Sequence, residues 1–324
     1  MKNMEIDQKK IKILSIIGQR ATLGTCLFEN ENKFDNLIVL SADTSTSAGL
    51  DKFRKIKSQK YLEMGISEQN MMGVAAGLSS EGFNVLTTTF SPFQTLRCLE
   101  QIKINLGYMK FKVTMVGLAS GVTLGTLGYT HCSIEDIGVM HSIPNIQILS
   151  PADGLETYKS VLAALDSDNS TYIRLTGKSP SNIVYNDDYN FKIGLAEKIT
   201  DFGDDVCLIS TGSMVYHSMA ASKILLEQNI KSSVYNFHTL RPLDNITLDK
   251  IFSKFKIIVT IEEHSILNGL GSIIANKIAT SNKKNFLLKL GLPHNYEKSG
   301  EYDDILNFYK LNSQGITQSV KKIL

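Results

Sequence analysis

The sequence predicts an α/β protein made of two doubly wound domains with mainly parallel sheets. Near-continuous apolar runs alternate with helix-length segments, as buried parallel strands and their crossover helices require. Strands are predicted at residues 36–43, 84–90, 112–119 and 146–151 in the first part of the chain, and at 206–210, 233–236, 257–261 and 286–290 in the second. Helices are predicted over residues 67–81 and 152–165.

A break in this pattern indicates where the two domains meet. Over residues 177–189, Ser, Pro, Asn and Asp replace the apolar periodicity, which is typical of a linker. A chain of 324 residues suits two domains. We therefore expect one domain over residues 1–185 and a second over 186–324.

Composition and charge narrow the class of function. The formal net charge is +2 and no dense block of Lys and Arg occurs, which argues against nucleic acid or an anionic membrane as the main partner. Apolar stretches fall short of the roughly 18–20 residues needed to span a bilayer, and the charged N-terminus does not resemble a signal peptide. The four cysteines stand apart, so we expect reduced, buried thiols in a cytoplasmic protein: Cys26, Cys98, Cys132 and Cys207.

The most informative segment is MGISEQNMMGVAAG, residues 64–77. Ser67 is a favourable N-cap residue, and it places Glu68 in the first turn of the predicted helix, where the helix dipole favours a carboxylate. On these residues alone, a stabilising first-turn acid is the simplest explanation of Glu68.

An aromatic pair and a histidine are the other candidates for a site. Phe90 and Phe93 flank a Ser-Pro pair that ends the preceding strand, so they form either a core contact or a wall for a flat heterocycle. His131 lies at the mouth of a glycine-rich loop, as either a surface residue or a catalytic one. Its neighbour Cys132 is not expected to act as a nucleophile with it, because adjacent loop residues seldom face each other.

Two acidic segments are predicted to have no metal-binding role. Glu262-Glu263-His264 lacks a helical metal-ligand spacing and is interpreted as a loop after the strand at residues 257–261. Gly203-Asp204-Asp205 leads directly into a strand and is interpreted as a turn.

Taken in order, short segments resemble transketolase and 1-deoxyxylulose-5-phosphate synthase from their middle to their C-terminus. Among them are SAD at residues 41–43, GISEQN at 65–70, TFSPF at 89–93, GYTH at 128–131 and SPADG at 150–154. The second domain adds TGS at 211–213, RPLD at 241–244, EEH at 262–264 and GLG at 269–271. Each motif is weak alone, but their shared order across nearly the whole chain is specific.

The resemblance implies a thiamine-diphosphate enzyme and gives roles to the candidate residues. Glu68 corresponds to the glutamate that hydrogen-bonds N1′ of the aminopyrimidine and moves the proton that activates the cofactor. Phe90 and Phe93 correspond to aromatics around the pyrimidine, with Phe93 as the stacking partner. His131 corresponds to a histidine that contacts the reacting oxygens of the sugar.

Substrate binding is also implied by the resemblance. Arg20, Ser47 and Arg174 fall where the family grips the phosphate of a sugar phosphate, although Arg174 also suits a surface charge near a strand end. Leu127 stands where the family usually has an aspartate that contacts a substrate hydroxyl, and Ala119 where a histidine is common. We therefore expect the transketolase chemistry with a changed acceptor.

The family's diphosphate-binding half, with its Gly-Asp-Gly motif and magnesium ligands, has no counterpart in the sequence. The resemblance therefore implies the pyrimidine-binding and C-terminal subunit of a split transketolase, which transfers two-carbon ketol units in carbohydrate metabolism. A separate subunit would hold Mg²⁺ and the diphosphate, within a heterotetramer that contains a homodimer of this chain. The alternatives are a beta-type subunit of a 2-oxoacid dehydrogenase and a non-catalytic subunit that keeps the fold.

Overall fold

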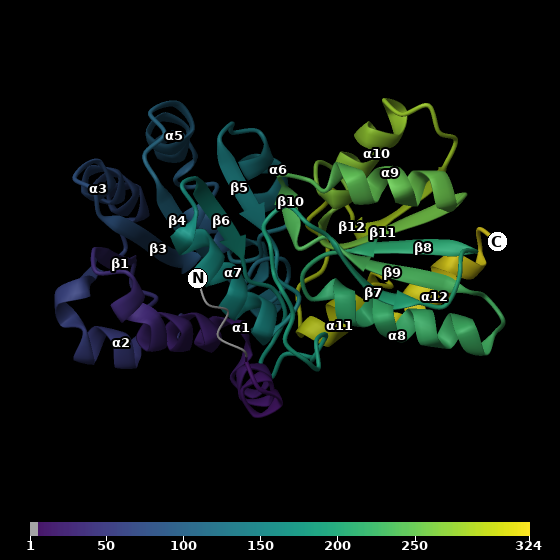
Figure 1. Cartoon of the computed structure of the whole chain (residues 1–324), viewed down its shortest axis with the longest axis horizontal. Helices are drawn as coiled ribbons and strands as arrows, with labels where there is room; N and C mark the ends of the chain where they lie inside the picture. The colour runs from purple at the N-terminus through teal and green to yellow at the C-terminus, as the bar shows by residue number, and fades with distance from the viewer. Residues whose placement is uncertain (1–5) are drawn as a thin grey trace.

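The computed structural model describes residues 6–324 and shows two α/β units, each built around one sheet (Figure 1). The elements of the first unit are α1 (Gln8–Asn30), η1 (Glu31–Lys33), β1 (Leu37–Ser41), α2 (Asp51–Ile56), η2 (Ser58–Lys60), β2 (Tyr61–Glu63), α3 (Glu68–Ser80), β3 (Asn84–Phe90), α4 (Ser91–Gln94), α5 (Leu99–Gln101), η3 (Ile102–Tyr108), β4 (Val113–Leu118), η4 (Gly125–Thr130), α6 (Asp136–His141), β5 (Ile146–Leu149), α7 (Gly154–Asp166) and β6 (Ser170–Arg174).

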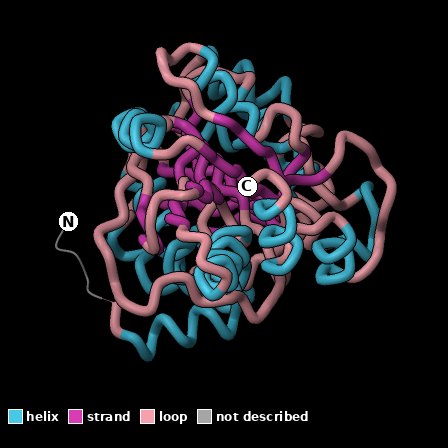
Figure 2. The backbone as a smooth tube through the Cα atoms, turned by 90° about the vertical axis from the view of Figure 1, so that its right-hand side faces the viewer, coloured by secondary structure: helices cyan, strands magenta, loops and turns pink. Residues whose placement is uncertain are grey.

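The second unit follows after the segment of residues 175–196, which contains the predicted linker. Its elements are β7 (Glu197–Asp201), β8 (Val206–Ser210), α8 (Met214–Glu227), β9 (Ser232–Asn236), β10 (Thr239–Arg241), α9 (Asn245–Lys254), β11 (Ile257–Ser265), α10 (Leu270–Ala279), β12 (Phe286–Leu292), α11 (Tyr302–Phe308) and α12 (Ser313–Lys321). Seen from the side, the strands lie together in the middle with helices around them (Figure 2).

Both sheets are mainly parallel, as the sequence predicts. The first has seven strands in the order β10-β5-β6-β4-β3-β1-β2, and the second has five in the order β12-β11-β8-β9-β7. Only β10 with β5 and β7 with β9 pair in the antiparallel direction among the described strands. The sequence analysis missed β10, a three-residue strand from the second half of the chain that extends the first sheet.

Helix α1 differs from the sequence-based expectation about membrane spans. The 26-residue run Gln8–Lys33 is long and apolar enough to cross a bilayer by length and composition. However, 56% of its most apolar window is buried inside the protein, against α7 and α2 among others, and core helices of soluble proteins pass the same test. The helix also bends at Gly18, whose φ is 76°.

Parallel strands bring several chain segments to one edge of the first sheet. The carboxyl ends of β1, β3, β4 and β6 meet at this edge because these strands run side by side in the same direction. In open α/β sheets this is the edge at which ligands bind. The loops after Ser41, Phe90 and Leu118 therefore lie near one another.

A close backbone contact fixes α1 against the loop that follows β1. A Cβ added to Gly24 would lie 1.9 Å from the carbonyl oxygen of Gly49, and one added to Gly49 would lie 2.7 Å from the Cα of Ala21. Gly49 also has a φ of 67°, in the left-handed region that favours glycine. The loop that carries Ser47 is therefore held by this contact.

We expect Gly24→Ala to destabilise the chain by about 1–3 kcal/mol, because the new methyl group overlaps backbone that cannot move aside. Gly73→Ala in α3 is the matched control, since a Cβ there meets nothing within 4 Å. That control should stabilise by about 0.5–1 kcal/mol through the better helix propensity of alanine. Urea denaturation of the isolated chain measures both effects, and equal midpoints for the two variants would contradict the contact.

Candidate active site

Glu68 is a buried carboxylate at the start of α3. Its exposed fraction is only 4%, and one carboxylate oxygen lies 2.8 Å from a guanidinium nitrogen of Arg97. Ser67 occupies the N-cap position and Glu68 the first turn, as predicted, but the Ser67 side chain makes no capping hydrogen bond. The Ser67 hydroxyl donates to the carbonyl of Met64 instead of capping the helix, so its loop geometry overrides its capping preference.

The aromatic pair and the histidine come together beside Glu68. Strand β3 ends at Phe90, and the short helix α4 that follows presents Phe93. The ring centroids of Phe90 and Phe93 lie 6.4 Å apart, and that of His131 lies 6.2 Å from Phe90 and 5.4 Å from Phe93, all edge to face. All three side chains are partly exposed, so they line a surface and do not form a closed core contact.

Arg97 contacts both Glu68 and Phe93, and the sequence analysis did not identify it. Its guanidinium carbon lies 4.0 Å from the centroid of the Phe93 ring while its Nη1 pairs with Glu68. The backbone carbonyl of Arg97 accepts a hydrogen bond from the Gln69 side chain, at 3.1 Å. Arg97 is 29 positions from Glu68 in the sequence, so only the fold brings them together.

A buried network of polar side chains holds the turn that carries Phe90 and Phe93. The Ser91 hydroxyl, between Phe90 and Phe93, lies 2.6 Å from the Tyr172 hydroxyl, 3.1 Å from the Ser133 hydroxyl and 3.3 Å from a carboxylate oxygen of Asp136. The Tyr172 hydroxyl donates to Asp136 at 2.8 Å. This network therefore ties the α4 turn to the segment that follows His131.

Arg174 lies at the centre of this network and is not a surface charge. Its Nε and Nη2 donate to the two Asp136 oxygens at 2.8 and 3.1 Å, and Nη2 also donates to the carbonyl of Glu263 at 3.2 Å. Both side chains of the pair are fully buried. Burial opposes the charge of Asp136, but the guanidinium holds the pKa of that carboxyl below its usual value.

The hydrogen bonds of Arg174 limit which of its nitrogens could bind a substrate phosphate, the role predicted from the sequence. Three of its hydrogen bonds serve Asp136 and Glu263, and within residues 6–324 only Nη1 has no partner. The alternative of a surface charge near a strand end was wrong, because the whole side chain is buried between the two units. The phosphate role stays a prediction.

Arg20 and Ser47 belong to two segments whose backbones are in contact. Arg20 precedes Ala21, whose backbone contacts Gly49 in the loop that carries Ser47. Across residues 6–324, neither side chain makes a hydrogen bond or an ion pair. Burial lowers the pKa of the half-buried Arg20. A partly desolvated guanidinium without an acidic partner is suited to bind an anion.

Leu127 lies in η4, on the loop that leads to His131, and 55% of its side chain is exposed. Ala119 directly follows β4, is buried and has a φ of 54°. Neither residue offers a polar group.

Glu263 of the second unit hydrogen-bonds the loop that leads from β4 to His131. This residue lies within β11, so the prediction of a loop at Glu262-Glu263-His264 was wrong: the strand continues to Ser265. Its buried carboxylate accepts hydrogen bonds from the Val122 amide at 2.8 Å, the Ser213 hydroxyl at 2.5 Å and the Tyr302 hydroxyl at 2.7 Å. Burial lowers the pKa of the neighbouring His264 to about 4.

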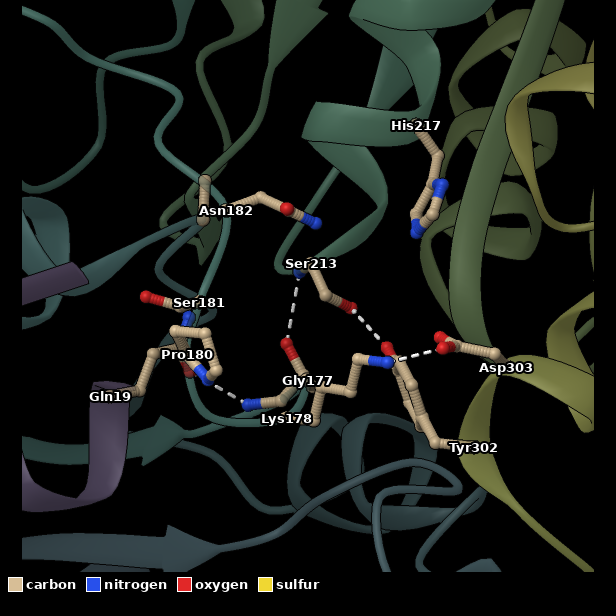
Figure 3. Close-up of a pocket in the computed structure, with 12 residues that line it drawn as sticks. Gln19, Gly177, Lys178, Pro180, Ser181, Asn182, Ser213, His217, Tyr302 and Asp303 are labelled. Carbon is tan, nitrogen blue, oxygen red and sulfur yellow. Dashed lines mark hydrogen bonds and ion pairs between the residues drawn. The ribbon is translucent and has the colours of Figure 1, made fainter. Parts of the chain in front are cut away.

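A small pocket lies between the two units and is lined in part by Gln19, Ser213 and Tyr302 (Figure 3). Its volume is about 50 Å³, enough for a water molecule, and an ion pair between Lys178 and Asp303 lies at its edge. It shares no residue with the Glu68 cluster, so we assign it to the contact between the units.

The two aspartates of the Gly203-Asp204-Asp205 turn have structural partners. Asp204, in the turn between β7 and β8, pairs with Lys254 at 2.7 Å, and Asp205 accepts from the Lys231 amide at 2.7 Å. Over residues 6–324, no group of three or more His, Cys, Asp or Glu side chains is arranged to hold a metal ion. All four cysteines are free and buried, as predicted.

We expect Arg174→Met to cost about 3–5 kcal/mol of stability, because it leaves Asp136 buried without its countercharge. The matched control is Arg54→Met, which removes an exposed pair to Asp51 of the same 2.8 Å length and should cost no more than about 1 kcal/mol. Chemical denaturation gives both values. A loss below about 1 kcal/mol for Arg174→Met would show that the buried pair does not hold the site together.

Comparison with known proteins agrees with this geometry. The family "Transketolase, pyrimidine binding domain" matches residues 17–180, and "Transketolase, C-terminal domain" matches residues 194–316. A putative transketolase C-terminal section from Methanocaldococcus jannaschii is 33% identical over 305 residues, covering 94% of this chain and 95% of that protein. One of the subunits of an apulose-4-phosphate transketolase from Phocaeicola vulgatus is 30% identical, over 94% of this chain and 97% of that one.

A solved structure described as a split gene transketolase, inactive beta4 tetramer, superposes with a TM-score of 0.84 at 30% identity, covering 94% of this chain and 97% of that one. Both domain matches and the full-length relatives point the same way: the chain belongs to the transketolase family, as a subunit of the split, C-terminal kind.

Proposed function

We propose that this chain is the pyrimidine-binding and C-terminal subunit of a thiamine-diphosphate-dependent enzyme that transfers two-carbon ketol units between sugars or sugar phosphates. The observation that carries the proposal is the buried Glu68 carboxylate near the partly exposed ring of Phe93, since Arg97 contacts both of them. Membership of the transketolase family, through its pyrimidine-binding domain, supports the choice of cofactor.

The residues present fit an aminopyrimidine. Glu68 offers a carboxyl group beside the Phe93 ring, and a flat aminopyrimidine needs a group that shares a proton with its ring nitrogen and an aromatic face to stack on. When bound, thiamine diphosphate supplies the nucleophilic carbon and the electron sink of the reaction. In this proposal Glu68 holds a proton at N1′ and Phe93 orients the ring.

His131 and the cationic residues would act on the sugar. The His131 ring makes edge-to-face contacts with both phenylalanines, which supports a place for His131 beside a substrate bound above the pyrimidine. There it would donate or accept a proton at the oxygens of that substrate. Arg20 and Ser47 would bind a substrate phosphate. Arg20 suits this role better than Arg174, because the described residues give Arg20 no acidic partner.

We further propose that a separate subunit holds Mg²⁺ and the diphosphate, within a heterotetramer that contains two copies of this chain. The relative from Phocaeicola vulgatus is itself one subunit of a divided enzyme, and the solved relative is described as an inactive tetramer of beta chains. The Gly203-Asp204-Asp205 turn does not suit magnesium, because Lys254 and the Lys231 amide already engage its carboxylates. Four free, buried cysteines support a cytoplasmic location.

We expect Glu68→Ala to lower turnover of the reconstituted complex by about 10²–10⁴-fold, because a positioned proton-transfer group is lost. The control is Glu81→Ala at the exposed end of the same helix, which should leave turnover unchanged. A coupled assay with both subunits, cofactor and Mg²⁺ measures the two rates. More than a tenth of wild-type activity in Glu68→Ala would contradict the role of Glu68.

The acceptor is proposed to differ from that of an ordinary transketolase, and Leu127 to set the difference. An exposed leucine on the loop before His131 offers apolar contact, whereas an aspartate would accept a hydrogen bond from a hydroxyl. The name of the relative that acts on apulose 4-phosphate supports a specialised sugar.

We therefore expect the complex to prefer a deoxygenated or keto-type acceptor over ribose 5-phosphate or erythrose 4-phosphate. Leu127→Asp should shift the ratio of kcat/KM values towards the hydroxylated aldoses, because sites that pair a hydroxyl discriminate by up to about 10⁴–10⁵-fold. Steady-state kinetics with both acceptor types tests this. Ribose 5-phosphate as the best acceptor of the unmodified complex would refute the specificity role of Leu127.

A further inference from the structure

One cation makes both of the contacts that a bound pyrimidine would need. Arg97 pairs with the Glu68 carboxylate at 2.8 Å, and its guanidinium carbon lies 4.0 Å above the centroid of the Phe93 ring. A guanidinium is planar, so it lies over an aromatic face much as a heterocycle does. The acceptor and the stacking surface assigned above to the cofactor are thus both in contact with one side chain of the same subunit.

An aminopyrimidine and this guanidinium cannot use the same face of Phe93 and the same oxygen of Glu68 at the same time. A ring stacked on Phe93 needs the space about 3.5–4 Å from its face, which is the ordinary contact distance between carbon atoms. The Arg97 guanidinium carbon lies at that height over the ring. Arg97 Nη1 also occupies the approach to one oxygen of the Glu68 carboxylate, so a ring edge that hydrogen-bonds that oxygen must displace it.

The local structure allows Arg97 to leave without a rearrangement of the backbone. Its carbonyl is held by the Gln69 side chain at 3.1 Å, and its amide donates to the carbonyl of Pro92 at 3.2 Å. Its side chain is 41% exposed, whereas that of Glu68 is 5% exposed. A rotation of the side chain alone would therefore move the guanidinium into solvent and leave the carboxylate in place.

We propose that Arg97 competes with the aminopyrimidine of the cofactor for Glu68 and Phe93. Arg97 is then a positioning residue that holds the Glu68 carboxylate and the Phe93 ring in their binding arrangement until the pyrimidine displaces it. Part of the binding free energy of the cofactor is used to break the Arg97 contacts, so Arg97 lowers cofactor affinity. This inference rests on the proposed function of the Glu68 site.

The test compares cofactor binding by three variants in the complete complex. Arg97→Met keeps the length of the side chain and removes its charge and its planar group, whereas Arg97→Lys keeps the charge alone. Lys254→Met is the matched control, because Lys254 has the same 41% exposure, an acidic partner at 2.7 Å and an aromatic ring 5.4 Å away, in the second unit. Thiamine diphosphate is titrated by calorimetry into this chain with its partner subunit and Mg²⁺.

We expect Arg97→Met to bind thiamine diphosphate about three- to ten-fold more tightly than wild type, since one partly exposed ion pair and one cation–π contact no longer oppose it. Arg97→Lys should lie between the two, and Lys254→Met should match wild type. An equal or weaker affinity in Arg97→Met overturns the competition. A wild-type complex that does not bind the cofactor at all overturns the proposed function, and with it this inference.

Discussion

The fully buried ion pair between Asp136 and Arg174 is the interaction on which the site depends. It joins the end of β6 to the start of α6, and through Ser91 it reaches the turn between the two site phenylalanines. A buried charge is tolerated only when its partners are in place. The pair therefore fixes the α4 turn and its aromatic residues relative to the sheet more strictly than apolar packing would, because hydrogen bonds have preferred directions.

The second unit also contributes hydrogen-bond partners to this buried network. Arg174 also donates to the Glu263 carbonyl, while the Glu263 side chain binds the Val122 amide at the start of the segment that leads to His131. The C-terminal unit thus positions a loop of the first unit by direct hydrogen bonds. Strand β10 adds a backbone connection, since it pairs with β5 at the edge of the first sheet. The two units form one support for the candidate site.

The fold was predictable where local pattern decides it, and the site only in part. Buried parallel strands such as β3 and β8 are apolar along their length, so the sequence marks them. Strand β10 has three residues and pairs across the two units, which leaves no local signal. Glu68, Phe93 and His131 were found through their motifs, whereas Arg97 and the Asp136–Arg174 pair arise from contacts between distant segments. Ser67 shows the converse, because its hydroxyl takes a partner that capping preference does not anticipate.

The contrast between two buried carboxylates indicates which of them is available to a ligand. Glu263 accepts hydrogen bonds from three donors that belong to packed elements, and these donors use most of the acceptor capacity of its two oxygens. Glu68 is almost as buried, but within residues 6–324 its only partner is the partly exposed Arg97. Removing an acid from water is unfavourable unless hydrogen bonds replace those of the solvent. A fold that buries Glu68 with a single, displaceable partner therefore leaves this carboxylate able to exchange that partner for a ligand, which is the property that a binding site requires and a structural acid lacks.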